Sequence, residues 1–295
     1  MIILEQGPQG QPVCFEAPRD LVAAWSLDSV RPALERIEAA RRQGLWVAGW
    51  IAYEAGFAFE DRLARLRPRI DGPLLVFGLY DAPGPVPAHD PRPVRLAPLV
   101  PQIDREDYDA AFARAKAFIA AGDCYQVNLT FPLATTLIEG GPRDLAAALA
   151  RLQPVGYGAY ADMGVGPVIV SRSPELFFRL TAGGGIEARP MKGTAPRHAD
   201  SALDARQAAA LAESVKDRAE NLMIVDLLRN DIARLAQVGS VRVPELFRIE
   251  SYATLHQMTS RITARLAQAA DLARLMAALF PCGSVTGAPK IRAMQ

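Results

Sequence analysis

The chain has 295 residues, of which 50% are hydrophobic and 22% are charged, so it can form the core of one large domain or two ordinary ones, and intrinsic disorder is excluded. Its 33 basic and 32 acidic side chains leave a formal net charge of +1, which excludes strong attraction to nucleic acid or an anionic membrane. The three cysteines lack the spacing of a zinc or redox site and are too few for a disulfide scaffold. Because the sequence starts with no export signal and contains no long apolar run, we expect a cytoplasmic protein.

The first predicted elements form an N-terminal α+β region. A helix is predicted near residues 29–43, and the apolar runs 45–53 and 73–80, bounded by glycine and proline, are typical of strands. Seven prolines among the 23 residues that follow exclude helix and central strand and favour an extended segment. The predicted organisation is therefore an N-terminal region at 1–81, a proline-rich linker at 82–104 and a second region at 105–295.

The second region begins with a helix that Asp104 caps and Gly122 ends. Apolar and polar residues then alternate strictly over 125–131, which indicates a strand with one face on a core. A long helix is predicted over 201–237, with room for one break. Before it, further strands are predicted at 168–171, 176–180 and 186–190. Because strands and helices do not alternate regularly, the predicted fold class is α+β.

The charged residues Glu175 and Lys192 stand at the ends of strand-like runs, where binding and catalytic loops are usually built. The simpler interpretation is that both are solvated loop charges. Lysine is rare in this chain, however, and its compact ammonium can lose a proton where arginine cannot. Gly193 allows a ligand to approach the backbone, and Thr194 adds a hydrogen-bond donor. These features favour a functional site.

Glu220 lies in the long predicted helix, on a stripe that also contains Ile224, Leu227 and Asp231. A carboxylate beside buried aliphatic side chains needs a cation as its partner. That cation is either an arginine or lysine side chain or a Mg²⁺ ion, which one or two carboxylates can hold together with water and substrate oxygens. Periodicity does not choose between an ion pair and a metal ligand.

Two further stretches contain candidate binding groups. Residues 281–290 form a glycine, serine and threonine segment leading into Pro289, and exposed amides there would bind an anion such as a carboxylate. This segment does not match the phosphate-loop pattern. His256 lies in a predicted strand among small polar residues, although a lone histidine is more often a structural hydrogen-bonding group. No nucleophile elbow supports a hydrolase.

Six segments, taken in order, resemble the chorismate-utilising enzymes. They are GDCYQVNLT (122–130), SRSPELFF (171–178), RPMKGTAPR (189–197), AENLMIVDLLRNDIARLA (219–236), TLHQMTS (254–260) and GSVTGAPKIRAM (283–294). The resemblance implies an α+β fold with two stacked antiparallel β-sheets flanked by helices, like that of anthranilate synthase component I. It also implies a Mg²⁺-dependent site between the sheets.

Within this family, Lys192 and the segment GWIAYEAG (49–56) are similar to the aminodeoxychorismate synthases, whereas anthranilate synthases have a small residue in place of the lysine. The resemblance implies that Lys192 attacks carbon 2 of chorismate as a neutral amine while Glu175 protonates the departing carbon 4 hydroxyl. Ammonia then adds at carbon 4, which gives 4-amino-4-deoxychorismate for p-aminobenzoate and folate biosynthesis. Glu220 is implied as a Mg²⁺ ligand. The implied substrate-binding residues are Gly193, Thr194, His256, Gly283, Ser284 and Thr286.

The resemblance also concerns the partner and the length of the chain. Because no glutaminase triad is present, it implies that ammonia comes from a separate glutamine amidotransferase subunit in a heterodimer. Family members continue past the position of Gln295 with further strands, a second Mg²⁺ carboxylate and a glycine-rich loop, and an incomplete sheet would expose unpaired edges. Three interpretations stay open: an aminodeoxychorismate synthase component incomplete at its C-terminus, an anthranilate synthase component, and an inactive fragment or partner-binding module.

Overall fold

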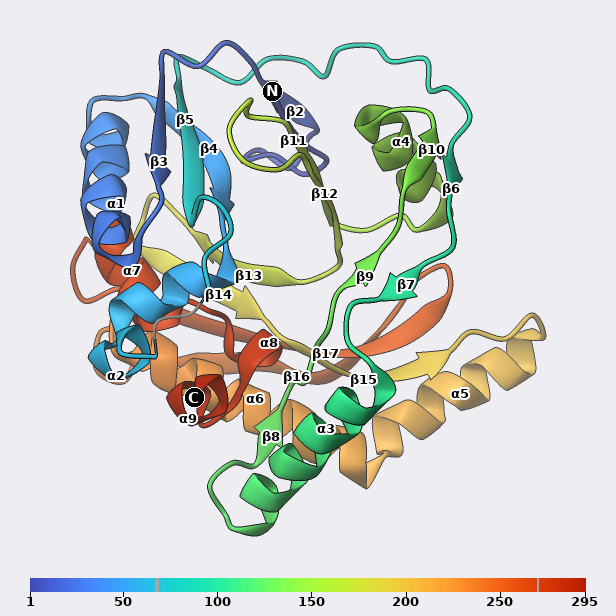
Figure 1. Cartoon of the computed structure of the whole chain (residues 1–295). Coiled ribbons are helices and arrows are strands. Elements are labelled where there is room, and N and C mark those ends of the chain that lie inside the picture. Colours follow the sequence, from blue (N-terminus) through green and yellow to red (C-terminus); the bar gives the residue numbers. More distant parts are fainter. Residues whose placement is uncertain (67–68, 270) are drawn as a thin grey trace. The chain divides into compact units, whose positions relative to one another are not determined.

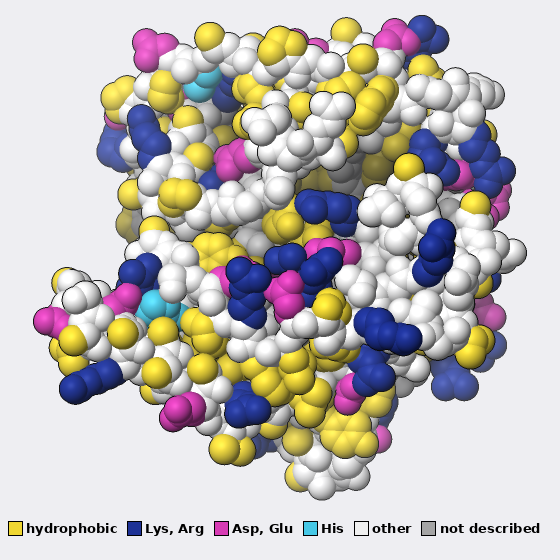
Figure 2. Space-filling view, turned by 180° about the vertical axis from the view of Figure 1, so that it is seen from behind, with side chains coloured by type: hydrophobic (Ala, Val, Ile, Leu, Met, Phe, Trp, Pro, Cys, Tyr) yellow, Lys and Arg dark blue, Asp and Glu magenta, His cyan; other side chains and the backbone are white. Residues whose placement is uncertain are grey.

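The computed structural model describes residues 1–66, 69–269 and 271–295 (Figure 1). Contacts between Cα atoms divide it into two compact units, which are residues 1–174 together with Gln295 (unit 1) and residues 175–294 (unit 2). Within the described ranges, no helix is both long enough and apolar enough to cross a membrane. Figure 2 shows acidic and basic side chains intermixed over one face, in agreement with the near-zero net charge.

Unit 1 combines helices with small antiparallel sheets. Its helices are α1 (Leu27–Arg42), the 3₁₀ helix η1 (Tyr53–Phe59), α2 (Asp61–Ala64), α3 (Arg105–Ala120) and α4 (Pro142–Leu152). Its strands are β1 (Ile2–Leu4), β2 (Val13–Phe15), β3 (Asp20–Ala24), β4 (Trp46–Ile51), β5 (Leu75–Tyr80), β6 (Arg95–Leu96), β7 (Val100–Pro101), β8 (Gln126–Val127), β9 (Leu133–Ala134), β10 (Leu137–Glu139), β11 (Tyr157–Ala161) and β12 (Ile169–Ser173). One sheet has the order β12-β11-β1-β2 and another the order β3-β5-β4.

The helix predicted near 29–43 and the strands predicted in 45–53 and 73–80 are confirmed as α1, β4 and β5. On α1, Val30, Leu34 and Ile37 recur at helical spacing, and each is fully buried. α1 packs against β3, β4 and β5, so this stripe covers the three-stranded sheet. Each fully buried aliphatic side chain of this kind contributes about 1.5–3 kcal/mol to stability.

The helix predicted after Asp104 is also confirmed. The Asp104 carboxylate accepts a hydrogen bond of 2.8 Å from the backbone N–H of Asp107, and Gly122 follows the end of α3 with a φ of 80°. The strand predicted over 125–131 is wrong for most of its length, because only Gln126–Val127 form a strand, β8. Tyr125, predicted to face a core, is 70% exposed.

The proline-rich segment 82–104 lies inside unit 1, and the division between the units falls at Pro174. In this segment β6 pairs with β10 and β7 pairs with β9. The buried Asp144 carboxylate of α4 accepts hydrogen bonds from the backbone N–H groups of Arg92 and Gly141, and His89 Nε2 lies 2.9 Å from it. These two backbone hydrogen bonds, followed by the Arg92 side chain, lower the pKa of Asp144 to about 2. The segment is therefore extended, as predicted, but fastened to α4.

Unit 2 consists of one antiparallel sheet with helices beside it. Its helices are α5 (Ser201–Glu213), α6 (Val215–Ala233), α7 (Leu272–Leu279), α8 (Gly283–Thr286) and α9 (Lys290–Met294). Its strands are β13 (Leu176–Leu180), β14 (Gly185–Arg189), β15 (Met191–Pro196), β16 (Arg242–Ser251), β17 (Leu255–Arg265) and β18 (Gly287–Ala288). The sheet order is β13-β14-β17-β15, and β16 also pairs with β17.

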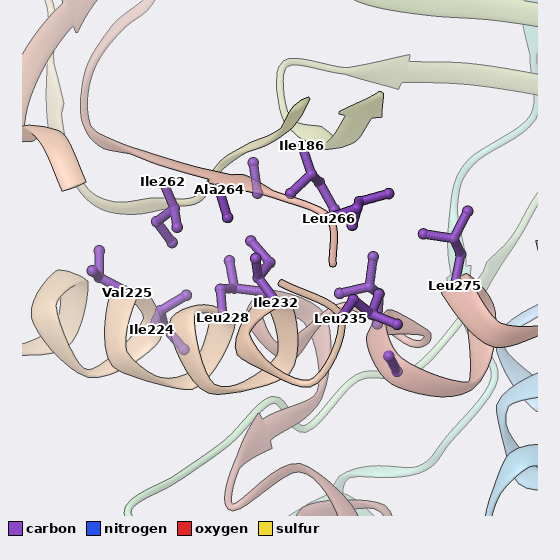
Figure 3. Packing of buried hydrophobic residues seen from close by; sticks show 13 residues of the cluster. Ile186, Ile224, Val225, Leu228, Ile232, Leu235, Ile262, Ala264, Leu266 and Leu275 are labelled. Carbon is purple, nitrogen blue, oxygen red and sulfur yellow. The ribbon is translucent and has the colours of Figure 1, made fainter. Parts of the chain in front are cut away.

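The core of unit 2 lies between this sheet and α6, and Figure 3 shows Ile224, Leu228 and Ile232 pointing from the helix toward the strands. Alternation along β14 explains the packing: Ile186 and Ala188 are buried on the helix side, and Glu187 between them makes ion pairs with Arg189 and Arg261. The sequence therefore supplies one apolar and one charged face, and the predicted α+β class with antiparallel sheets is confirmed.

The long helix predicted over 201–237 is confirmed as two helices with one break. The break falls at Ser214, whose hydroxyl accepts a hydrogen bond of 3.2 Å from the backbone N–H of Asp217 and so caps α6. Near the other end of α6, Asp231 is buried and forms an ion pair of 2.7 Å with Lys290. Burial raises the pKa of Asp231, while Lys290 opposes the shift. Removing one partner from such a pair usually costs about 3–5 kcal/mol, so this pair fastens α9 to α6.

Candidate active site

Lys192 and Gly193 form an irregular point in strand β15. The ladder with β17 pairs Met191 with Thr259 and Thr194 with Gln257, and it shifts register between these pairs. Gly193 has a φ of 95°, which favours glycine. A Cβ atom at this position would lie 2.9 Å from Cβ of Asp217, so the missing side chain lets the strand pass close to α6. The space that a side chain would fill at Gly193 is therefore occupied by Asp217 and Met258, and substrate binding by the Gly193 backbone stays a prediction.

Glu175 lies immediately before β13, and the structure brings it together with Lys192 and Ser284. Burial raises the pKa of the Glu175 carboxyl, and three weaker effects oppose it: a hydrogen bond with Ser284, the positive charge of Lys192 and a hydrogen bond from the Met191 backbone. A raised pKa keeps a larger fraction of the carboxyl protonated near neutral pH. The site therefore combines an amine with a carboxyl group that can give up a proton.

The segment 281–290 presents its hydroxyl groups to the protein rather than to solvent. Ser284 and Thr286 are 5% and 3% exposed. The Thr286 hydroxyl is within hydrogen-bond distance of the carbonyls of Cys282 and Gly283, at 3.2 and 3.3 Å. A Cβ atom on Gly283 would lie 1.6 Å from a methyl group of Leu227, so α8 packs directly on α6. Substrate binding by Gly283, Ser284 and Thr286 stays a prediction.

His256 is buried in β17 and has both ring nitrogens engaged inside unit 2. Its Nδ1 lies 2.8 Å from Oγ of Ser251, and its Nε2 lies 3.0 Å from Oδ1 of Asp204. Because an ionised carboxylate only accepts hydrogen bonds, Nε2 carries a hydrogen. Hydrogen bonds from Arg197 and from the His198 backbone hold the pKa of Asp204 well below its usual range. This network gives His256 a structural role in joining β17 to α5, and its substrate-binding role stays a prediction.

Thr194 lies on the exposed part of β15, two residues after Lys192. Its hydroxyl donates a hydrogen bond of 3.1 Å to the side-chain oxygen of Gln257 on the neighbouring strand. Such a cross-strand pair stabilises the sheet by a fraction of a kcal/mol to about 1 kcal/mol. The substrate-binding role of Thr194 stays a prediction.

Glu220 on α6 is half-exposed, with 40% of its side chain accessible, and its carboxylate lies 3.8 Å from Nζ of Lys216. An exposed pair of this spacing contributes only about 0.3–0.5 kcal/mol to stability. The Glu220 carboxylate can therefore bind another cation at little cost. Over the described parts of the chain, no group of three or more His, Cys, Asp and Glu side chains could hold a metal ion. A single half-exposed carboxylate could supply one oxygen ligand to a Mg²⁺ ion, and a role of Glu220 in metal binding stays a prediction.

Sequence reasoning missed Asn221, which follows Glu220 and is fully buried. Its Nδ2 donates hydrogen bonds of 3.2 Å to the backbone carbonyls of Lys192 and Met258. Its Oδ1 accepts a hydrogen bond of 2.6 Å from the Ser260 hydroxyl. The available signal was an amide placed in the apolar run NLMIVDLL, because a buried polar group must find partners.

A family model described as chorismate binding enzyme matches residues 2–295. The chain belongs to the chorismate binding enzymes.

Two relatives in this family are named aminodeoxychorismate synthase component 1. The one from Klebsiella aerogenes is 41% identical over 273 residues, which cover 84% of this chain and 60% of the relative. The one from Salmonella typhimurium is 47% identical over 193 residues, which cover 65% of this chain and 42% of the relative. The chain therefore spans less than two thirds of the length of these two relatives.

A solved structure confirms the fold. Anthranilate synthase component I from Streptococcus pneumoniae superposes with a TM-score of 0.78 at 21% identity, over 96% of this chain and 75% of that chain. The fold predicted from the sequence, like that of anthranilate synthase component I, therefore agrees with this structure.

Proposed function

We propose that the chain is the chorismate-aminating component of an aminodeoxychorismate synthase, which converts chorismate and ammonia into 4-amino-4-deoxychorismate. The observation that carries this proposal is that the positive charge of Lys192 acts on Glu175, a carboxyl group whose pKa is raised by burial. The names of the two relatives support the same activity. In this proposal the product is a precursor of p-aminobenzoate, and the protein acts in folate biosynthesis in the cytoplasm.

The two residues have complementary roles in the proposed reaction. The neutral amine of Lys192 forms a bond to ring carbon 2, both ring double bonds shift, and the bond from carbon 4 to its hydroxyl breaks. Glu175 gives its proton to that oxygen, which leaves as water. Ammonia then forms a bond to carbon 4, both double bonds shift back, and the bond from carbon 2 to Lys192 breaks. The nitrogen added at carbon 4 loses one proton, which restores the Glu175 carboxyl. The lysine thereby directs nitrogen to the para position.

Glu220 is the residue that would hold Mg²⁺ in this proposal. The ion would supply positive charge that binds the chorismate carboxylate. Support comes from the half-exposed Glu220 carboxylate on α6, whose only pairing between described residues is the long one with Lys216.

Ammonia is proposed to come from a glutamine amidotransferase subunit that forms a heterodimer with this protein. Support comes from the relatives' name, component 1, which distinguishes them from a further component. Free ammonium salts at high pH, where more ammonia is unprotonated, should replace that subunit in a test tube.

Product analysis tests the proposed function. The complete gene product is incubated with chorismate, Mg²⁺ and an ammonium salt, and the products are separated and identified by mass spectrometry. We expect 4-amino-4-deoxychorismate. Anthranilate would show that this is an anthranilate synthase component, in which ammonia attacks carbon 2 directly. Absence of any amination would favour the partner-binding module.

The variant Glu220→Gln tests the metal assignment. Because the amide is a weaker ligand without charge, we expect the Mg²⁺ concentration for half-maximal chorismate binding to rise by at least about tenfold, a common size for metal-site changes. Mg²⁺ titrations of chorismate binding measure this shift. Glu213→Gln, an exposed position on α5, is the matched control. An unchanged titration curve for Glu220→Gln would show that Glu220 is not a Mg²⁺ ligand and only forms an ion pair with Lys216.

A further inference from the structure

Asn221 lies at the point where the strand of Lys192 meets the helix of Glu220. It is fully buried on α6, and its carboxamide reaches across to the backbones of β15 and β17. Both elements that carry the proposed chemistry therefore meet at this one side chain.

Both N–H groups and the oxygen of the Asn221 carboxamide form hydrogen bonds. Its two N–H bonds go to the carbonyl oxygens of Lys192 and Met258, and its oxygen accepts from the Ser260 hydroxyl. Ser260 in turn accepts a hydrogen bond of 3.1 Å from the backbone N–H of Phe247 on β16. Because both sides of the carboxamide are engaged, its orientation is fixed.

The irregularity of β15 explains why this side chain is needed. The regular pairing of β15 with β17 passes from Met191 to Thr194 and leaves out Lys192 and Gly193. The carbonyl of Lys192 is held instead by Asn221, at 3.2 Å. Gly193 with its φ of 95° allows the bend, but glycine by itself restricts the backbone least of all residues. The hydrogen bond from Asn221 therefore supplies a restraint that the strand ladder does not.

We infer that Asn221 is a positioning residue for Lys192, which holds the backbone of the nucleophile at a fixed distance from the Glu220 turn of α6. Its catalytic significance rests on the proposed function, whereas its effect on the backbone does not. A small displacement of a nucleophile is costly, since reactivity depends on near-attack geometry.

The variant Asn221→Asp tests the inference, because it keeps the size and the acceptor oxygen but removes the two donors at neutral pH. Asn230→Asp makes the same change on the exposed side of the same helix and is the control. Hydrogen exchange followed by mass spectrometry on the 295-residue chain should show faster exchange over residues 191–194 in Asn221→Asp, with β14 unchanged. Equal acceleration in β14 and β15, or no acceleration, would overturn the inference.

Kinetics on the complete gene product supply the second measurement. We expect kcat of Asn221→Asp to fall by about tenfold to a hundredfold, with KM for chorismate within twofold of the parent, because substrate binding is intact while the amine is misplaced. A fall in kcat matched by an equal rise in KM, or an unchanged kcat, would contradict a positioning role.

Two further results separate a failure of the inference from a folding defect and from a failure of the proposed function. Ser260→Ala leaves both donors of Asn221 but releases its orientation, so a smaller acceleration over 191–194 is expected even where Asn221→Asp does not fold. If Ser260→Ala changed the exchange rate of residues 191–194 and of β14 by the same factor, or changed neither, the inference would then be overturned. A complete protein that gives no para amination would refute the proposed function, whereas para amination that persists without Lys192 would exclude the nucleophilic role of this lysine. In both cases the exchange result would still decide whether Asn221 holds this backbone.

Discussion

Replacement of Lys192 with alanine is expected to lower the rate of para amination by about a thousandfold or more, the size seen when a covalent nucleophile is removed. Without the amine, no bond forms at ring carbon 2, so nothing directs ammonia to carbon 4. Any residual amination should then place nitrogen at carbon 2. Separation of the ortho and para products by chromatography, with the complete protein and ammonium as nitrogen donor, measures both effects.

The control for this variant is Lys216→Ala, since Lys216 is 81% exposed and pairs only loosely with Glu220. It should leave the para rate within about twofold of the parent, as most changes at exposed positions do. A mass increase on the peptide that contains Lys192, trapped during turnover, would identify the covalent intermediate. Para amination at the parental rate in Lys192→Ala would exclude the nucleophilic role.

The variant Glu175→Gln is expected to lower the rate of amination and to raise stability. The rate should fall by about a hundredfold to ten-thousandfold, because an amide cannot protonate the departing hydroxyl. Since only the protonated carboxyl is active, the rate of the parent protein, measured at a constant concentration of unprotonated ammonia, should decline as pH rises through the raised pKa of Glu175. Rate measurements from acid to alkaline pH, in parent and variant, test both statements.

The stability effect follows from the sign of the same pKa shift. Burial raises the pKa of Glu175 above its ordinary value of 4.5, so the folded state disfavours the ionised form. The contribution of the Glu175 carboxyl to the free energy of unfolding is therefore fully present below pH 4.5. It is lost as pH rises through the pKa of the folded state. Glutamine carries no charge, so Glu175→Gln should unfold at higher denaturant concentration than the parent at pH 8 and at a similar concentration at pH 4.

Glu187 provides a control of opposite sign. Burial alone would raise its pKa, but the guanidinium groups of Arg189 and Arg261 outweigh burial and lower it from 4.5. It therefore contributes stability above pH 4.5 that is lost as pH falls through the lowered folded pKa. Glu187→Gln should consequently lower stability at pH 8. If both variants shifted stability in the same direction, the burial of Glu175 would not be the cause.

Local patterns predicted several of the elements of unit 2. The strand predicted at 176–180 has the bounds of β13, and the break predicted within 201–237 falls at Ser214. These predictions succeed because alternation and helical spacing are local properties of the chain. The strand predicted over 125–131 mostly fails, because alternation does not reveal whether a packing surface exists for the apolar face.

The candidate site shows the same limit. Glu175, Lys192 and Ser284 could be singled out by residue type and resemblance, and the structure brings them together. The roles of Asn221 and of the pair between Asp231 and Lys290 depend on contacts between residues far apart in the sequence. Such contacts leave no periodic trace, so a sequence can flag these residues as polar groups among apolar ones but cannot name their partners.

The attachment of the proline-rich segment to Asp144 bears on how the protein withstands acid. Because the pKa of this carboxyl is held at about 2, its charge persists at pH values where ordinary carboxyls near 3.8 are half neutralised. The attachment therefore outlasts mild acidification and weakens only as pH approaches 2. Exposed extended stretches are preferred cleavage points for proteases, and the attachment at Arg92 restrains this part of the segment wherever Asp144 stays ionised.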